Sequence, residues 1–183
     1  LMELFEQPET IFEHISLIEE CDNTIIRKYA SLMLSMLFKS HLPTLRFEQA
    51  LSIQESLIEL LTHDSDLYVQ YFLCDSITTF LFVIENTPEL WSAFSQNDQA
   101  WLNIFDLANN LVKDQNFLST GLYLWRNIYS LFPNSGSNEL LFALLSITTT
   151  SLSSPLESDR LQALTLFDYL RGCIPDQLGS ESQ

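Results

Sequence analysis

Apolar residues recur at steps of three and four positions along nearly the whole chain, which is the period of an amphipathic α-helix. Alternating apolar and polar runs, which indicate β-strands, are rare. Clusters of Asp, Asn, Ser, Thr and Pro separate the periodic segments, and such clusters predict turns that cap the helices on either side. The pattern therefore predicts an all-α protein whose helices follow one another through short turns.

The predicted helices form four antiparallel pairs that resemble one another in length. Ile26–Ala30 in the first pair aligns with Val69–Leu73 in the second at an offset of 43 positions. A period of about 40–47 residues built from two helices is typical of HEAT repeats, which stack because no pair buries its apolar face alone. We expect a right-handed α-solenoid of about four HEAT-type pairs, and a closed bundle of eight helices is the alternative.

One array is expected to span the whole chain as a single domain, residues 1–183. A short turn at Pro88–Trp91 falls between the second and third pairs, where the repeat match is loosest. Helical character is already present at the first residues, so we expect the chain to be a piece of a longer protein. The expected repeats cover residues 4–42, 46–86, 98–132 and 138–174, and a flexible tail covers residues 175–183.

Composition sets limits on the class of protein. Hydrophobic residues make up 46% of the 183 positions and charged residues 17%, so the chain is too apolar to be disordered. It contains only 4 glycines, whereas all-β folds and phosphate-binding loops need glycine for their turns. The longest apolar runs are much shorter than the ~20 residues of a membrane-spanning helix. We therefore expect neither a nucleotide-binding loop nor insertion into a membrane.

The balance of charge favours protein partners. The chain has 8 Lys and Arg against 24 Asp and Glu, a net charge of −16. This sign repels the phosphates of nucleic acids and attracts basic protein segments. Seven acidic residues lie between Glu3 and Asp22, before any Lys or Arg. They are either the solvated face of the first helix or an acidic lip for a basic partner, and acidity that serves only solubility is the simpler alternative.

The residues that usually carry catalysis are scattered. The three histidines have no partner at metal-ligand spacing, and the three cysteines lack a C-x-x-C pair and are expected to be reduced thiols in an intracellular protein. No nucleophile elbow or kinase-like motif is present. We therefore expect no enzyme activity, no metal and no cofactor. These scattered residues are His14, His41, His63, Cys21, Cys74 and Cys173.

The second helix of each pair is the expected binding surface, because second helices line the concave side of a solenoid. Small polar and aromatic residues recur there on one stripe, a composition that suits protein docking; ordinary surface or inter-repeat packing is the alternative. Arg27 and Arg160, near acidic Asp22 and Asp159, are expected to tie adjacent turns together. The candidate binding residues are Lys28, Ser31, Ser35, Tyr71, Asp75, Thr78, Tyr123 and Asn127.

A family resemblance spans about residues 4–95. The order and spacing of five segments resemble the amino-terminal repeats of importin-β-type nuclear transport receptors. Where that family commonly has Lys and Arg, this chain has Ser35 and Gln70. The five segments are Leu4–Pro8, Ile11–Ile18, Ile26–Leu34, Ile53–Leu61 and Pro88–Trp91.

The resemblance implies a protein-binding segment of a receptor that shuttles between cytoplasm and nucleus. Such receptors bind the GTPase Ran in its GTP form, carry basic cargo and touch the Phe-Gly repeats of nucleoporins. Carried over by position, the Ran-facing residues are Lys28, Ser31, Tyr71, Asp75 and Thr78. The alternative is a HEAT-repeat scaffold of another assembly, of the vesicle-coat adaptin or phosphatase type, with no dependence on Ran.

Overall fold

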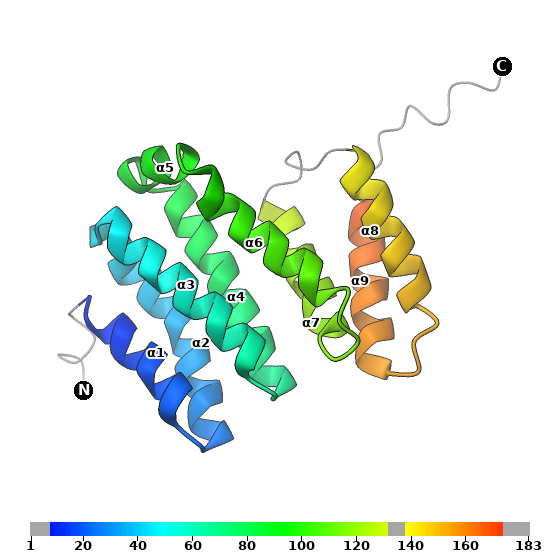
Figure 1. Ribbon diagram of the computed structural model, residues 1–183, viewed down its shortest axis with the longest axis horizontal. Helices are drawn as coiled ribbons and strands as arrows, with labels where there is room; N and C mark the ends of the chain where they lie inside the picture. Colours follow the sequence, from blue (N-terminus) through cyan, green and yellow to red (C-terminus); the bar gives the residue numbers. More distant parts are fainter. Residues whose placement is uncertain (1–7, 132–137, 174–183) are drawn as a thin grey trace. The chain divides into compact units, whose positions relative to one another are not determined.

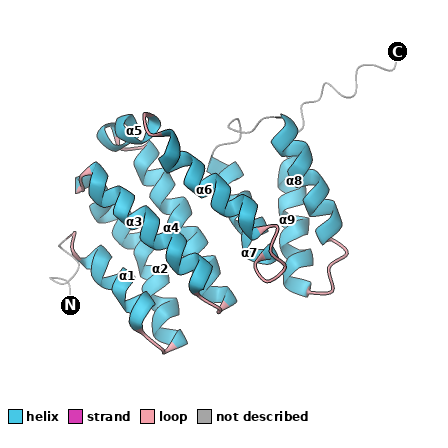
Figure 2. Cartoon of the chain, in the orientation of Figure 1, coloured by secondary structure: helices cyan, strands magenta, loops and turns pink. Residues whose placement is uncertain are grey.

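A computed structural model describes residues 8–131 and 138–173. Over these residues the chain is helical and contains no strand (Figure 2), so the all-α prediction is confirmed. The chain divides into two compact units, Leu1–Leu107 and Ala108–Gln183, which are described separately below. The expected tail at residues 175–183 lies outside the described residues.

Unit 1 contains two helix pairs arranged in two layers. The first helix of each pair packs on its second helix, and the two second helices pack along one another. In Figure 1 the first helices α1 and α3 lie in front of the second helices α2 and α4. The elements are α1 (Thr10–Glu20), α2 (Thr24–His41), the 3₁₀ turn η2 (Leu42–Thr44), α3 (Phe47–His63), α4 (Leu67–Glu85), α5 (Pro88–Ser95) and α6 (Asp98–Leu111), which spans the boundary of the units.

Side-chain caps fix where the second helices begin. The Asn23 carboxamide accepts the backbone N–H groups of Ile25 and Ile26, and the Asp66 carboxylate accepts those of Tyr68 and Val69. Both caps satisfy N–H groups that the first helical turn leaves without an intrahelical partner. Clusters of capping residues therefore start α2 and α4, as the sequence pattern predicts.

The segment after α4 differs from the expected short turn. It forms the eight-residue helix α5, which begins at Pro88 and buries Leu90 and Phe94. Proline suits the first turn of a helix because its missing N–H is not needed there. Phe94 is the reason for the extra helix, since its ring reaches the aromatic core.

Four phenylalanines from four helices form the centre of this core. Phe80 of α4 contacts Phe38 of α2 and Phe94 of α5 edge to face, with ring centroids 5.8 Å and 5.9 Å apart. Phe94 in turn meets Phe47 of α3 at 5.1 Å. Edge-to-face pairs add to the free energy gained by burying the rings. This chain of rings joins both pairs of unit 1 to α5.

Helix α4 is long and apolar enough, by length and composition, to cross a membrane. More than half of its most apolar window is buried inside the protein, and Val69, Leu73 and Phe80 are fully buried. The core helix of a globular protein passes the same test of length and composition. Its apolar residues are accounted for by packing against α2, α3 and α5.

Unit 2 contains α7 (Leu118–Leu131), α8 (Asn138–Ser151) and α9 (Glu157–Cys173). Helix α9 packs against both α7 and α8, and the Tyr169 hydroxyl donates to the Tyr129 carbonyl at 3.3 Å. Gly121 of α7 lies against the end of α6, where a Cβ atom would lie 2.6 Å from the backbone nitrogen of Val112. Only glycine allows the two backbones to approach this closely.

Candidate functional site

The first turn of α2 is tied to the second pair by an ion pair. Arg27 Nε donates to Asp64 Oδ2 at 2.8 Å, and Arg27 Nη1 donates to the carbonyls of Cys21 and Asp22 at 2.9 Å and 3.2 Å. Only 16% of the Arg27 side chain and 6% of the Asp64 side chain are exposed. The expected link between turns therefore exists, but Asp22 contributes its carbonyl and the charged partner is Asp64.

A hydrogen bond from a side chain to a carbonyl of the preceding turn recurs in two further second helices, at the fourth residue of each helix. Gln70 of α4 donates to the Asp64 carbonyl at 2.7 Å, and Arg160 of α9 donates to the Ser154 carbonyl at 2.8 Å. Each side chain, like Arg27, reaches the carbonyl six residues before it. In α7 the fourth residue is Gly121. The same turn geometry therefore precedes three of the second helices, although the residue at this position differs among them.

Lys28, the first predicted binding residue, lies between α2 and α4. Its Nζ is 3.1 Å from Asp66 Oδ2 and 4.9 Å from the centre of the Tyr68 ring. Burial raises the pKa of Asp66, but the hydrogen bonds from Lys28 and from the Val69 N–H outweigh it, so the pKa falls below the ordinary 3.8. Lys28 therefore keeps an ionised carboxylate at the start of α4.

The predicted residues Ser31 and Ser35 lie where α2 packs on α4. Ser31 is fully buried; its hydroxyl donates to the Arg27 carbonyl, and its own carbonyl accepts the Ser76 hydroxyl at 2.9 Å. Ser35 Oγ is half-buried and 3.2 Å from Ser76 Oγ. Both serines therefore contribute to the contact between α2 and α4. Because Ser31 is fully buried, its side chain is not accessible to a partner.

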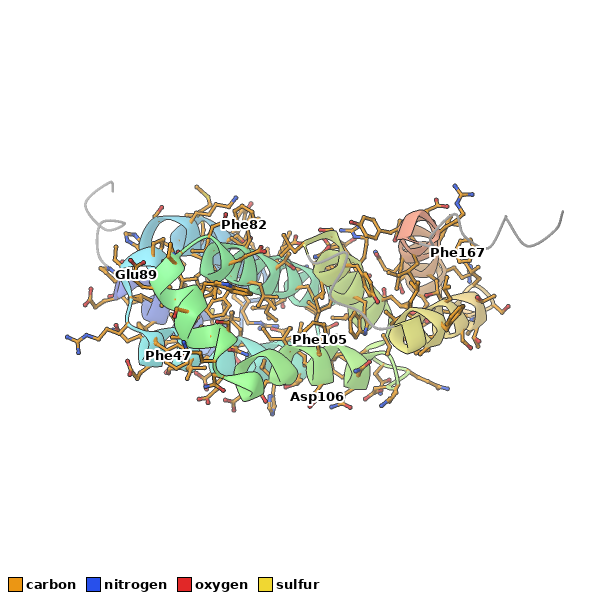
Figure 3. The ribbon with its side chains drawn as sticks, turned by 90° about the horizontal axis from the view of Figure 1, so that it is seen from above. Phe47, Phe82, Glu89, Phe105, Asp106 and Phe167 are labelled. Carbon is orange, nitrogen blue, oxygen red and sulfur yellow. The ribbon has the colours of Figure 1, made fainter. Side chains whose placement is uncertain are left out.

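The predicted residues on α4 share one face of that helix. Tyr71, Asp75 and Thr78 are half-buried and follow each other at steps of four and three, with exposed Tyr68 and Phe82 continuing the row at either end. Figure 3 shows Phe82 on the side of unit 1 opposite Phe47 of α3. Thr78 Oγ1 donates to the Cys74 carbonyl at 2.7 Å, so this side chain is held against its own helix.

Tyr123 and Asn127, the remaining predicted residues, belong to unit 2. The Arg126 guanidinium lies 4.5 Å from the centre of the Tyr123 ring and donates to Asn127 Oδ1 at 2.9 Å. Tyr123 is half-buried and Asn127 is buried. The three side chains form one local cluster on α7.

Sequence reasoning missed the exposed apolar residues of α2. Tyr29 is 67% exposed and Met36 is 61% exposed, although neither is among the predicted binding residues. Of the twelve large hydrophobic side chains exposed among the described residues, seven lie on α2 and α4. Six of these seven, all except Ile26, share a surface with Lys39 and with four of the predicted residues, and we call this surface the docking face: Ile25, Lys28, Tyr29, Leu32, Met36 and Lys39 on α2, and Tyr68, Tyr71, Asp75, Thr78 and Phe82 on α4.

In unit 1 the acidic helices α1 and α3 lie beside the basic helix α2, whereas α4, in the same layer as α2, carries Asp75 and Glu85. Helices α1 and α3 contain no Lys or Arg, and α2 contains no Asp or Glu. An open pocket of about 370 Å³ lies between α1 and α3, with Arg27 and Asp64 in its wall. The exposed carboxylates of the acidic layer are Glu13, Glu19, Glu20, Glu48, Glu55 and Glu59.

The nucleophilic and metal-binding groups remain scattered in the structure. In the part of the chain that is described, no group of three or more His, Cys, Asp or Glu side chains is placed to hold a metal ion. Burial raises the pKa of Cys74 well above its ordinary value, and the charge of Asp75 adds to the shift. A thiol held in its protonated form is a poor nucleophile and a poor metal ligand.

No family model, curated protein or solved structure matches the chain. What the chain does is therefore inferred from its own residues and their arrangement.

Proposed function

We propose that this chain is a non-enzymatic protein-binding module whose partners dock on α2 and α4. The observation that carries the proposal is the docking face, where exposed apolar and aromatic side chains from two adjacent helices gather. Exposed apolar patches rimmed by polar residues mark interaction sites on soluble proteins. Aromatic residues and Met are also enriched at protein interfaces. Tyr29, Met36, Tyr68 and Phe82 give this face that composition.

The proposed architecture is a HEAT-type solenoid. Three features support it: α2 packs along α4 and α1 packs on α3 within unit 1, α7 packs on α9 within unit 2, and the connection made by Arg27, Gln70 and Arg160 recurs in three turns. Repeats of this class stack through neighbouring helices and bind partners along extended surfaces. The docking face would then be one part of such a surface.

The specific form of the proposal is the amino-terminal segment of an importin-β-like receptor that shuttles between nucleus and cytoplasm. It is supported by the sequence resemblance over residues 4–95 and by the acidic helices α1 and α3 of unit 1. In this proposal Ran-GTP binds the docking face around Asp75 and Thr78. Basic cargo is drawn to the carboxylates of α1 and α3, since opposite charge speeds association and favours correct partners. Nucleoporin Phe-Gly repeats would be further partners.

Titration of the chain with Ran tests this form of the proposal. Ran carrying a non-hydrolysable GTP analogue and Ran-GDP are titrated separately at near-physiological salt. We expect binding to the GTP form in clear preference to the GDP form. Equal affinities for the two forms, or no binding to either, would refute the importin-like form.

A HEAT-repeat scaffold of another assembly is the second candidate. The burial of Ser31 favours it, because one of the five residues carried over as Ran-facing has no exposed surface. This candidate needs the docking face but not Ran, so it predicts no nucleotide-dependent partner. Loss of a partner on substitution of Phe82 without any response to Ran would identify it.

A further inference from the structure

Four exposed apolar residues of α2 form a straight row that neither α1 nor α4 covers. They are spaced by four, three and four positions, the spacing of the a and d residues in a coiled coil. At the rise of an α-helix the row is about 16 Å long. We call this row the α2 seam: Ile25, Tyr29, Leu32 and Met36.

The charged side chains that α2 itself places beside the seam are positive. Lys28 and Lys39 flank the seam, and α2 carries no carboxylate, although the whole chain has a net charge of −16. Lys28 Nζ already forms an ion pair with Asp66 Oδ2, at a distance of 3.1 Å. Lys39 is exposed, and no carboxylate among residues 8–131 and 138–173 forms an ion pair with it. The seam is therefore an apolar strip beside an available cation, on a protein that is otherwise acidic.

We infer that the α2 seam is the docking site of an amphipathic helix with acidic flanks, supplied by a partner protein. Heptad spacing suits a helix laid along the row, since its own apolar residues would interdigitate with the seam. Carboxylates on the flanks of that helix would meet Lys39 and Lys28. This inference rests on the proposed protein-binding function and names the chemistry of one partner.

A second copy of the chain fits the seam less well. Two α2 helices laid together would bring Lys28 and Lys39 of one copy near the same cations of the other. Like charges juxtaposed at an interface oppose association. The charge pattern therefore selects a different, acidic helix as the occupant.

Two synthetic helical peptides of about 18 residues test the inference. Both carry leucines at the a and d positions; one has Glu and the other Lys at the flanking positions. Each labelled peptide is titrated with the full chain by fluorescence anisotropy at low and near-physiological salt. We expect the Glu peptide to bind at least about tenfold more tightly than the Lys peptide, with the preference shrinking as salt screens the charges.

Substitutions locate the site. Met36→Glu should weaken binding of the Glu peptide at least about fivefold, and Lys39→Glu should reduce or reverse the preference between the peptides. Phe142→Glu is the matched control, because Phe142 on α8 is 61% exposed, as Met36 is; we expect it to leave binding unchanged. Far-UV circular dichroism shows whether each variant keeps its helices.

The outcomes separate this inference from the proposed function. If both peptides bound equally and Met36→Glu abolished their binding, the seam would be a binding site for helices. The inference that its partner is acidic would be wrong. If Met36→Glu left peptide binding unchanged, or if neither peptide bound, the inference that the α2 seam is a docking site would be wrong. A dimer in sedimentation velocity that Met36→Glu dissociates would make a second copy the occupant and also overturn the inference. The titration with Ran uses no peptide, so it tests the proposed function in every case.

Discussion

Arg27, in the first turn of α2, forms a 2.8 Å ion pair with Asp64, the residue that follows α3. The two residues are 37 positions apart and belong to different helix pairs. The same guanidinium also donates to the carbonyls of Cys21 and Asp22. One side chain therefore fixes the turn of the first pair and attaches it to the second.

Replacing Arg27 with Met should destabilise unit 1 by about 2–3 kcal/mol, because it leaves the mostly buried Asp64 carboxylate without its cation. Urea denaturation followed by circular dichroism measures the change. Arg160→Met is the control: Arg160 also donates to two turn carbonyls but is exposed, so its loss should cost about 1 kcal/mol or less. Equal losses for the two variants would show that the ion pair contributes nothing to stability.

Replacing Gly121 with Ala should destabilise unit 2 by about 1–3 kcal/mol. Alanine is the better helix former by roughly 1 kcal/mol, but its Cβ would lie 2.6 Å from Val112 N and 2.9 Å from the Leu111 carbonyl carbon. These are backbone atoms, so the helices must move apart. Thermal denaturation of Gly121→Ala and of Ser130→Ala, an exposed site on the same helix, makes the comparison. A stabilised Gly121→Ala variant would contradict the close contact.

Phe80 and Phe82 lie two positions apart on α4 and should respond in opposite ways. Phe80→Ala removes the central ring of the aromatic core and should cost about 3–5 kcal/mol. Phe82→Ala changes an exposed residue of the docking face and should alter stability by about 0.5 kcal/mol or less. Chemical denaturation measures both. If Phe82→Ala were the more damaging change, the assignment of core and surface on α4 would be wrong.

Asp66 gives unit 1 a dependence on pH. Its pKa is lower in the folded chain than the ordinary 3.8, so its charge stabilises the fold above about pH 4 and this contribution disappears as the pH falls below that value. Asp66→Asn keeps an oxygen acceptor for the helix cap but loses the ion pair with Lys28. We expect it to cost about 0.5 kcal/mol near neutral pH and less at pH 3, because the contribution of the charge shrinks as the pH falls below 3.8.

Asp66→Ala separates the two roles of this residue. It removes the cap as well as the charge, so it should cost about 1 kcal/mol more than Asp66→Asn at either pH. Parallel urea titrations of the wild type and both variants at the two pH values give the comparison. A penalty for Asp66→Asn that stays constant down to pH 3 would exclude the ionised carboxylate as its source.

The helices of this protein follow closely from its sequence because turn chemistry and periodicity agree. Asn23 and Asp66 cap α2 and α4 where the sequence placed clusters of capping residues. The exception is α5, expected to be a short turn. Leu90 and Phe94 are four positions apart, so a single helical turn brings them onto the same buried face.

The exposed face of α2 is harder to predict from the sequence, since this helix is apolar around most of its circumference. Periodicity alone cannot say which of two apolar faces is buried. Tyr29 is absent from the predicted binding residues yet is exposed, whereas Ser31 is one of them and is fully buried. The decisive contact is with Ser76, 45 positions away. The partner of Arg27 was missed for the same reason, because Asp64 is brought close only by the stacking of the pairs.

The most direct test of the proposed function compares two chains in one titration. Ran loaded with a non-hydrolysable GTP analogue is titrated into the wild type and into Asp75→Lys at near-physiological salt, with Ran-GDP as the reference. We expect the wild type to prefer the GTP form and Asp75→Lys to bind it at least about fivefold more weakly. Equal affinity of the two chains, or no preference for the GTP form, would contradict the assignment of α4 as a Ran-binding surface.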